Sequence, residues 1–327
     1  FDKVNKLIDR QQVDLVVSPM YHPLVPITPK DVLLRLIKLQ QRELNRLFPK
    51  ATIAGFFPSE LAVDEDSLET ISVYSSQCLI DQTSVFPDGN YYPTVNFKGA
   101  KLFVSHRGIT EVIRSSPDQL LANNFFNYFW NLKDLQGESA GLCISVNDAE
   151  IFGHHYRERI HFLQEIYKSE IQFKTLSNVS FDPTTLWTNI PQITPSSWQT
   201  SRKDISNNNP YSHWTDQNNF LQRKYLGLAD YAYLQLKGFS DPDDQSNLGY
   251  AWRHYYQGIS SCHLYWLSNW PWWHPDLVQA GATNLVKAVR TLPVDKKEES
   301  SAETLYHNLV HEIWQYHWSG KVEENYV

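Results

Sequence analysis

The sequence is poor in cysteine, and this shortage excludes two kinds of stabilising site. Its three cysteines, Cys78, Cys143 and Cys262, stand far apart, with no CxxC pair and no cysteine–histidine ligand spacing. We therefore expect neither a disulfide framework nor a structural zinc site. Proteins without disulfides are typical of reducing compartments, so we expect a cytoplasmic location.

Basic runs and long apolar stretches are also missing. A formal net charge of -7 and a pI near 5.9 argue against nucleic acid as the main partner. No apolar run is long enough to cross a membrane, and no signal-peptide pattern opens the chain. We therefore expect neither a nucleic acid nor a membrane as a partner, and the sequence leaves the oligomeric state open.

Aromatic residues, by contrast, are abundant. The chain has 11 Trp, 18 Tyr and 16 Phe, although its mean hydropathy is only -0.45. Flat apolar faces among polar groups suit stacking against sugar rings. The alternative is that most of these side chains simply pack the core and the helices.

Short apolar runs alternate with segments of helical periodicity in the first half of the chain. The expected strands are 13–18, 51–57, 101–105 and 141–146, and the expected helices are 31–47, 65–71, one from Thr110, 118–136 and about 156–168. This alternation predicts a parallel sheet with helices outside it, and the number of successive units favours a barrel over a small open sheet.

The second half of the chain has a different character. Prolines and asparagines are frequent from about residue 177 to 218, and long helical patterns dominate after that. We therefore expect a barrel domain at 1–190, followed at 191–327 by a loop-rich segment and a helical C-terminal region. The charged segment 293–303 is expected to connect the last two helices, the final one being 303–318.

Polar residues that follow expected strands are the candidates for chemistry, because reactive groups of barrel folds gather where strands end. His22, Glu60, Arg107 and Asp148 all have this placement. Two carboxylates from separate strand ends are what glycosidic bond cleavage requires, one to attack the sugar and one to protonate the leaving oxygen. Glu60 and Asp148 are therefore the candidate pair.

Each candidate also has a plainer interpretation. Asp148 has the residue type that caps a following helix, and Glu150 competes with it as the acid. His22 either recognises sugar hydroxyls or packs in a proline-containing loop. Arg107 pairs either with a catalytic carboxylate or with a surface acid.

Two motifs that contain these candidates resemble motifs of a known enzyme family. Gly55-Phe56-Phe57-Pro58-Ser59-Glu60 resembles the nucleophile motif of glycoside hydrolase family 57, usually Gly-x-Trp-Pro-x-Glu, with Phe57 in place of the Trp. Asp148-Ala149-Glu150-x-Phe152-Gly153, 88 residues further on, is similar to the family's acid/base motif Asp-Gly-Glu-x-Phe-Gly. Ser18 to Pro23 and the region from Ser196 to Trp214 resemble two further elements, so the resemblance spans roughly residues 1 to 290.

The resemblance implies a distorted (β/α)7-type barrel with a helical C-terminal region, and a retaining enzyme for α-glucans that uses no metal or organic cofactor. Glu60 would be the nucleophile that forms a covalent glycosyl-enzyme, and Asp148 the acid/base. The substrate-binding residues would be His22, Phe57, Arg107, His154, Trp198 and Trp214. Hydrolysis and transfer, linkage and chain length are left open.

One expected element has no counterpart. The family normally opens with a strand carrying a His motif, and no such motif precedes the residues quoted above. We expect either that the chain belongs to a longer protein or that this wall of the site is absent. A non-catalytic carbohydrate-binding homologue is therefore an alternative.

A metal-dependent polysaccharide deacetylase or α-mannosidase is a further alternative. His154 and His155, with Asp148 nearby, suggest metal ligands. Adjacent residues point in different directions, however, so at most one of the two histidines is expected to face the same site as Asp148. The chain also has no convincing His-x-Asp or Asp-Asp pair at an early strand.

Overall fold

The protein folds into two compact units. The computed structural model describes residues 2–85, 91–136, 141–240, 246–269 and 272–322. The first unit comprises Phe1–Ser18 and Ile37–Trp198, and the second comprises Pro19–Leu36 and Gln199–Val327. The expected division at residue 190 stays a prediction about functional domains. Among the described residues, no helix is both long and apolar enough to span a bilayer.

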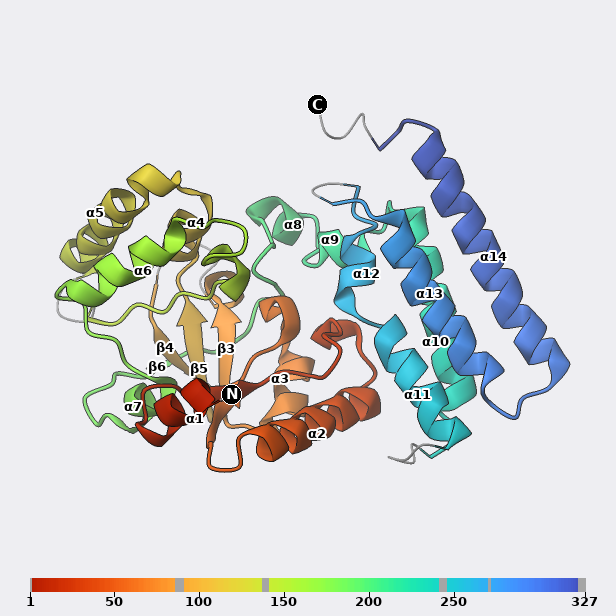
Figure 1. The fold of residues 1–327 in the computed structure, drawn as a ribbon, viewed down its shortest axis with the longest axis horizontal. Helices are drawn as coiled ribbons and strands as arrows, with labels where there is room; N and C mark the ends of the chain where they lie inside the picture. The colour runs from red at the N-terminus through yellow and green to blue at the C-terminus, as the bar shows by residue number, and fades with distance from the viewer. Residues whose placement is uncertain (1, 86–90, 137–140, 241–245, 270–271, 323–327) are drawn as a thin grey trace. The chain divides into compact units, whose positions relative to one another are not determined.

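The first unit is built on a mixed sheet. Its strands are β1 (Leu15–Val17), β2 (Ile53–Phe56), β3 (Gln77–Asp81), β4 (Thr94–Phe97), β5 (Ala100–Ser105) and β6 (Thr188–Asn189). The described part of the sheet has 6 strands in the order β1-β2-β3-β5-β4-β6. Because β1, β2, β3 and β5 are parallel, their carboxyl ends lie at one edge. The arrowheads of β3 and β5 mark that edge in Figure 1.

The expectation of an entirely parallel sheet is wrong at one place. Strand β4 runs antiparallel to β5. The two are joined by Lys98 and Gly99, with φ values of 48° and 90°, as in the tight turns that favour a hairpin. The sequence analysis overlooked this hairpin and also strand β3.

The helices of the first unit connect these strands. They are α1 (Asp2–Asp9), α3 (Glu65–Ser72), α4 (Arg107–Ser115), α5 (Asp118–Gln136), α6 (Arg159–Lys168) and α7 (Leu176–Phe181), together with the later part of α2 (Lys30–Leu47). Helices α4, α5 and α6 lie together (Figure 1) around a cluster that includes Ile109, Phe125 and Phe162. The alternation of strands and helices in this unit agrees with the α/β expectation.

The expected strand at 141–146 is not formed. Ile144 accepts a hydrogen bond from the His106 backbone N–H at 2.7 Å. The N–H groups of Ile144 and Val146, however, donate to the side-chain hydroxyls of Tyr91 and Thr110, at 3.0 and 3.3 Å. The segment therefore runs beside the end of β5 but is held by side chains instead of a ladder of backbone hydrogen bonds.

The second unit is helical, as expected for the C-terminal region. Its helices are α8 (Arg202–Ser206), α9 (Ser212–Thr215), α10 (Phe220–Leu236), α11 (Asn247–Gly258), α12 (Ser261–Tyr265), α13 (Pro275–Arg290) and α14 (Lys296–Trp318), with the start of α2. Helices α10, α11, α13 and α14 pack beside one another (Figure 1).

The charged segment 293–303 is mostly helix and not a connector. Helix α14 begins at Lys296, because the Asp295 side chain accepts a hydrogen bond from the Glu298 N–H at 2.9 Å. Glu298 and Glu299 lie in the first turn, where acidic groups stabilise the helix dipole. The run of charges therefore marks a helix start.

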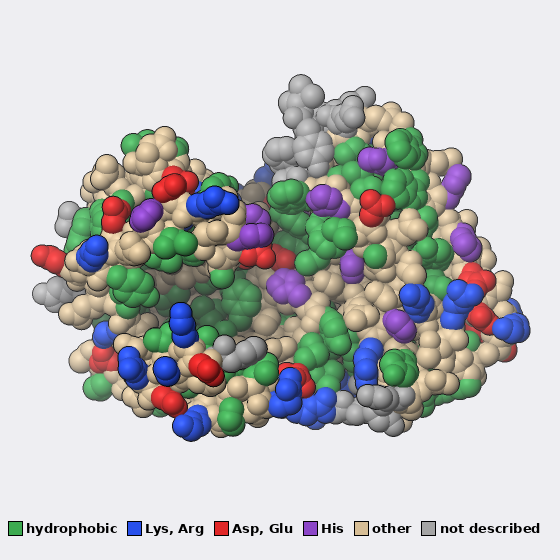
Figure 2. Space-filling view, in the orientation of Figure 1, with side chains coloured by type: hydrophobic (Ala, Val, Ile, Leu, Met, Phe, Trp, Pro, Cys, Tyr) green, Lys and Arg blue, Asp and Glu red, His purple; other side chains and the backbone are tan. Residues whose placement is uncertain are grey.

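Charged side chains of both signs are interspersed over the visible face of each unit (Figure 2). No single-signed field of the kind that follows a phosphate backbone stands out on this face.

A buried histidine begins helix α4. His106 is 5% exposed, and its Nδ1 accepts a hydrogen bond from the Ile109 N–H at 3.2 Å. Its ring lies edge-on to Tyr91, with centroids 4.4 Å apart, and to Tyr128. Burial lowers the pKa of His106 from its ordinary value of 6.5.

This lowered pKa predicts a stability that depends on pH. Below about pH 6.5 the unfolded chain takes up a proton at His106 that the folded chain resists, so the free energy of unfolding falls as the pH drops. His106→Asn retains a side-chain oxygen that can cap α4. We expect this variant to lose part of the pH dependence in urea titrations between pH 7 and 5. An unchanged pH dependence would contradict the role of His106. The pH dependence that remains in the variant is expected from His263, because burial also lowers the pKa of His263.

Candidate active site

The loop after β2 holds Glu60 in a strained conformation. Glu60 has φ 61° and ψ 17°, and the next residue, Leu61, has φ 49°. Left-handed backbone costs a side-chain-bearing residue on the order of 1–2 kcal/mol, and such strain persists only where the surroundings enforce it. Leu61 is 1% exposed and Ser59 is fully buried, so packing fixes the residues on both sides of Glu60. The strained turn leaves Glu60 itself half-buried.

Trp198 fixes the Glu60 carboxylate. Its indole Nε1–H donates to Oε2 of Glu60 at 2.8 Å, and its backbone N–H donates to the Glu60 carbonyl at 3.1 Å. Both side chains are half-buried. Trp198 therefore controls the direction of the carboxylate as well as the backbone that carries it.

The segment that carries Trp198, which we call the 193–198 strap, is itself tied down. Ser196 pairs with Val63 through two backbone hydrogen bonds, of 3.0 and 3.1 Å. The Ser196 and Ser84 hydroxyls lie 2.7 Å apart, and the Thr194 N–H donates to the Ser84 carbonyl at 2.8 Å. The strap is thereby anchored beside the loop that follows β2 and the turn that follows β3.

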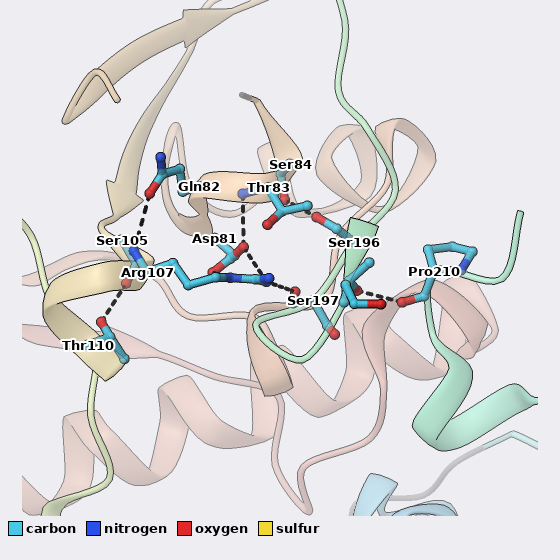
Figure 3. Close-up of polar contacts among 12 residues, drawn as sticks. Asp81, Gln82, Thr83, Ser84, Ser105, Arg107, Thr110, Ser196, Ser197 and Pro210 are labelled. Atoms are coloured by element: carbon cyan, nitrogen blue, oxygen red, sulfur yellow. Dashed lines mark hydrogen bonds and ion pairs between the residues drawn. The ribbon is translucent and has the colours of Figure 1, made fainter. Parts of the chain in front are cut away.

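A buried ion pair completes the anchoring (Figure 3). Asp81 ends β3 and is 3% exposed, and Arg107 begins α4 just after β5. Arg107 Nη2 lies 2.8 Å from Asp81 Oδ1, and it also donates to the Ser197 carbonyl at 3.0 Å. The pair thus connects two strand ends to the strap residue that precedes Trp198.

The partner of Arg107 is neither of the two that the sequence analysis considered. Asp81 is not one of the proposed catalytic carboxylates, and it is buried instead of lying at the surface. Asp81 was not among the predicted site residues, because β3 was not predicted as a strand. The apolar run Cys78-Leu79-Ile80 followed by an acid was the available signal.

Asp148 lies at the start of a short 3₁₀ turn, η5 (Ala149–Ile151). It is exposed, and its side chain makes no capping hydrogen bond, so the helix-cap interpretation does not account for it. Val146, two residues earlier, packs in the same apolar cluster as Leu61, Phe57 and Trp198. The segments that carry Asp148 and Glu60 therefore share one cluster.

The other predicted site residues have different surroundings. His154 is exposed and follows Gly153, whose φ is 97°. His22 belongs to the second unit, where its carbonyl accepts a hydrogen bond from the Ser261 N–H at 2.9 Å. Trp214, also in the second unit, is 0% exposed and stacks on Tyr265 with centroids 5.6 Å apart. This burial argues against the predicted stacking of Trp214 on a sugar ring.

Cysteine offers no competing nucleophile near these residues. Cys143 lies in the segment before Asp148, and burial raises the pKa of its thiol to about 12. Burial also raises the pKa of Cys78, in β3. Because the thiolate is the reactive form of cysteine, neither thiol is activated at neutral pH. The carboxylates of Glu60 and Asp148 therefore stay the candidate reactive groups of this region.

We expect removal of Arg107 to be costly for the first unit. In Arg107→Ala the buried Asp81 keeps a hydrogen bond from the Thr83 N–H, at 2.9 Å, but loses its cation. Breaking one side of a buried pair costs roughly 3–5 kcal/mol, and the part-exposed Arg107 should put this one near the lower end. Urea unfolding of Arg107→Ala, Asp81→Asn and the double variant measures the coupling between the two residues. Additive effects would contradict a functional ion pair.

Comparison with known proteins identifies one protein family whose model matches this chain. The model of glycosyl hydrolase family 57 matches residues 1–186. No curated protein matches the chain.

Several solved structures share the fold. The 4-alpha-glucanotransferase of Thermococcus litoralis is 15% identical with a TM-score of 0.63, over 90% of this chain and 49% of that chain. A GH57 branching enzyme of Thermococcus kodakaraensis is 14% identical with a TM-score of 0.67, over 95% of this chain and 73% of that chain. The alpha-amylase AmyC of Thermotoga maritima is 12% identical with a TM-score of 0.54, over 99% of this chain and 71% of that chain.

These likenesses confirm the expected fold class, a distorted (β/α)7-type barrel with a helical C-terminal region. At such low identity they establish the fold alone. The chain also spans only about half the length of the glucanotransferase.

Proposed function

Because the chain belongs to glycosyl hydrolase family 57, we propose that the protein is a retaining glycoside hydrolase or glucanotransferase acting on α-glucans. Glu60 is the proposed nucleophile and Asp148 the proposed acid/base. The names of similar structures, a glucanotransferase, a branching enzyme and an amylase, support α-glucan as the substrate class.

The proposed reaction has two steps. A Glu60 carboxylate oxygen attacks the anomeric carbon while the Asp148 carboxyl gives its proton to the departing glycosidic oxygen, which leaves a covalent glycosyl-enzyme. Asp148, now a carboxylate, then takes a proton from water or from a sugar hydroxyl that attacks the same carbon and releases Glu60. Water as the acceptor gives hydrolysis, and a glucan as the acceptor gives transfer.

The observation that carries the proposal is the strained, hydrogen-bonded setting of Glu60. A nucleophilic carboxylate must be held in one orientation, since misplacement of a reacting group is costly. The left-handed backbone of Glu60 and the 2.8 Å bond from Trp198 supply such a hold. Strained backbone of this kind clusters at functional sites, which supports a role for Glu60.

Replacing the nucleophile provides the direct test. Glu60→Gln retains the hydrogen-bonding shape of the side chain but cannot form the glycosyl ester, so we expect turnover of maltooligosaccharides to fall by at least about 10³-fold. Product chromatography on the full-length protein measures this and separates hydrolysis from transfer. Glu69→Gln, at an exposed position of α3, is the matched control and should retain activity. Unchanged turnover in Glu60→Gln would remove Glu60 from its role.

The indole hydrogen bond provides a second test. Trp198→Phe keeps an aromatic ring in the cluster but removes the N–H that orients Glu60. We expect kcat to fall about 10–100-fold while KM changes less, because a charge-assisted hydrogen bond is worth roughly 1.5–3 kcal/mol. Trp187→Phe is the control, since Trp187 packs in the same cluster. Equal kcat values for the Trp198 variant and the wild type would refute the orienting role.

One observation favours a second candidate function. Asp148 is exposed on a segment held by side-chain hydroxyls, whereas Glu60 is anchored by Trp198, so a homologue that binds carbohydrate without turning it over would also fit this site. Such a protein would bind maltooligosaccharides without releasing products, and Glu60→Gln would leave that binding intact.

The proposed role of the remaining predicted residues, apart from the buried Trp214, is to bind substrate. Phe57 and Arg107 lie in or beside the region around Trp198, which supports them, whereas His22 and His154 stay predictions. We also propose a cytoplasmic location, supported by the absence of disulfides among the described cysteines Cys78, Cys143 and Cys262.

A further inference from the structure

The turn that follows Asp148 gathers two histidines and an acid. Glu150, His154 and His155 are all exposed, and one ligand atom of each lies within 4.8 Å of the others. Across the described ranges of the chain, this is the one group of three such side chains that is close enough to hold a metal ion. The sequence analysis considered Asp148 as the acidic partner of these histidines, whereas the structure provides Glu150.

The spacing of one pair already suits a small cation. His155 Nε2 lies 3.2 Å from Glu150 Oε2. Two ligand atoms bound tetrahedrally at about 2.0–2.1 Å from zinc are roughly 3.3 Å apart. A zinc ion therefore fits between these two atoms with little movement, and the exposed ring of His154 lies beside the His155 ring, with centroids 4.8 Å apart.

The backbone organises this arrangement before any ion arrives. The N–H groups of His154 and His155 both donate to the Glu150 carbonyl, at 3.3 and 2.8 Å. Gly153 adopts a φ of 97°, a conformation that residues with a side chain rarely adopt. Its N–H donates to the Tyr156 carbonyl at 3.0 Å. Part of the entropy of ordering the ligands has thus already been lost on folding.

We propose that Glu150, His154 and His155 form a zinc-binding site. Two imidazole nitrogens favour zinc over magnesium or calcium, which prefer oxygen ligands. Because the three side chains are exposed, water completes the coordination of the ion. No step of the proposed glycosidase chemistry uses a metal, so the zinc proposal does not rest on that function, although His154 is also one of the predicted substrate-binding residues.

Isothermal titration of the purified full chain with zinc chloride tests the proposal. We expect one saturable site that His155→Ala and His154→Ala each weaken by at least about tenfold. Cobalt(II) is a second probe, since it takes zinc's place at such sites and its visible absorption reports nitrogen and oxygen ligation. That absorption should be lost in the same variants.

A matched control comes from helix α14. His307 and His311 are exposed and four residues apart, so they provide two ligands on one helix face. His307→Ala should leave the zinc affinity of the proposed site unchanged. Circular dichroism of each variant checks folding, which exposed substitutions should preserve.

Two results would overturn the proposal. One is the lack of saturable binding by the folded wild type below about 100 µM zinc. The other is a zinc affinity that His307→Ala reduces and His155→Ala does not, which would place the bound ion on α14.

Discussion

The Arg107 guanidinium is the contact on which the rest of the candidate site depends. It joins Asp81 at the end of β3 to the Ser197 carbonyl. Burying Asp81 without a cation would be unfavourable, and Arg107 supplies that cation. The same guanidinium group also donates to the Ser197 carbonyl. Together with the bonds of the strap to Val63 and Ser84, the ion pair thereby positions Trp198 and, through it, Glu60.

This arrangement explains how the strain at Glu60 is sustained. A left-handed glutamate would relax to an ordinary conformation if its neighbours allowed it. Burial of Leu61 and Ser59 fixes the backbone on each side, and Trp198 bonds both the carbonyl and the carboxylate of Glu60. Relaxation would break these contacts together. The cost of the strain is therefore offset by packing and hydrogen bonds that only this conformation permits.

The sequence predicted what depends on local pattern and missed what depends on distant partners. Helices α2, α3 and α5 and strands β1, β2 and β5 follow from periodicity, and Glu60 from its motif. Segment 141–146 has the composition of a strand, but two of its N–H groups bond to the side chains of Tyr91 and Thr110. The local sequence does not predict these distant partners. The same holds for Asp81, whose role depends on Arg107, 26 residues away. The hydrogen bond from the Trp198 indole to Glu60 joins residues that are 138 positions apart in the sequence, so it could not be predicted either.

The fold and the choice of acceptor in the proposed reaction depend on different parts of the molecule. Similar folds carry the names glucanotransferase, branching enzyme and amylase, so the sheet and its helices do not decide between water and sugar as the acceptor. That choice depends on how far water is excluded from the acceptor side of the glycosyl-enzyme. In this chain Glu60 is anchored by buried contacts, whereas Asp148 is exposed on an irregular segment held by side-chain hydroxyls. The proposed nucleophile thus belongs to the buried scaffold. The proposed acid/base belongs to the part of the site where sequence changes alter water access at the least cost to the fold.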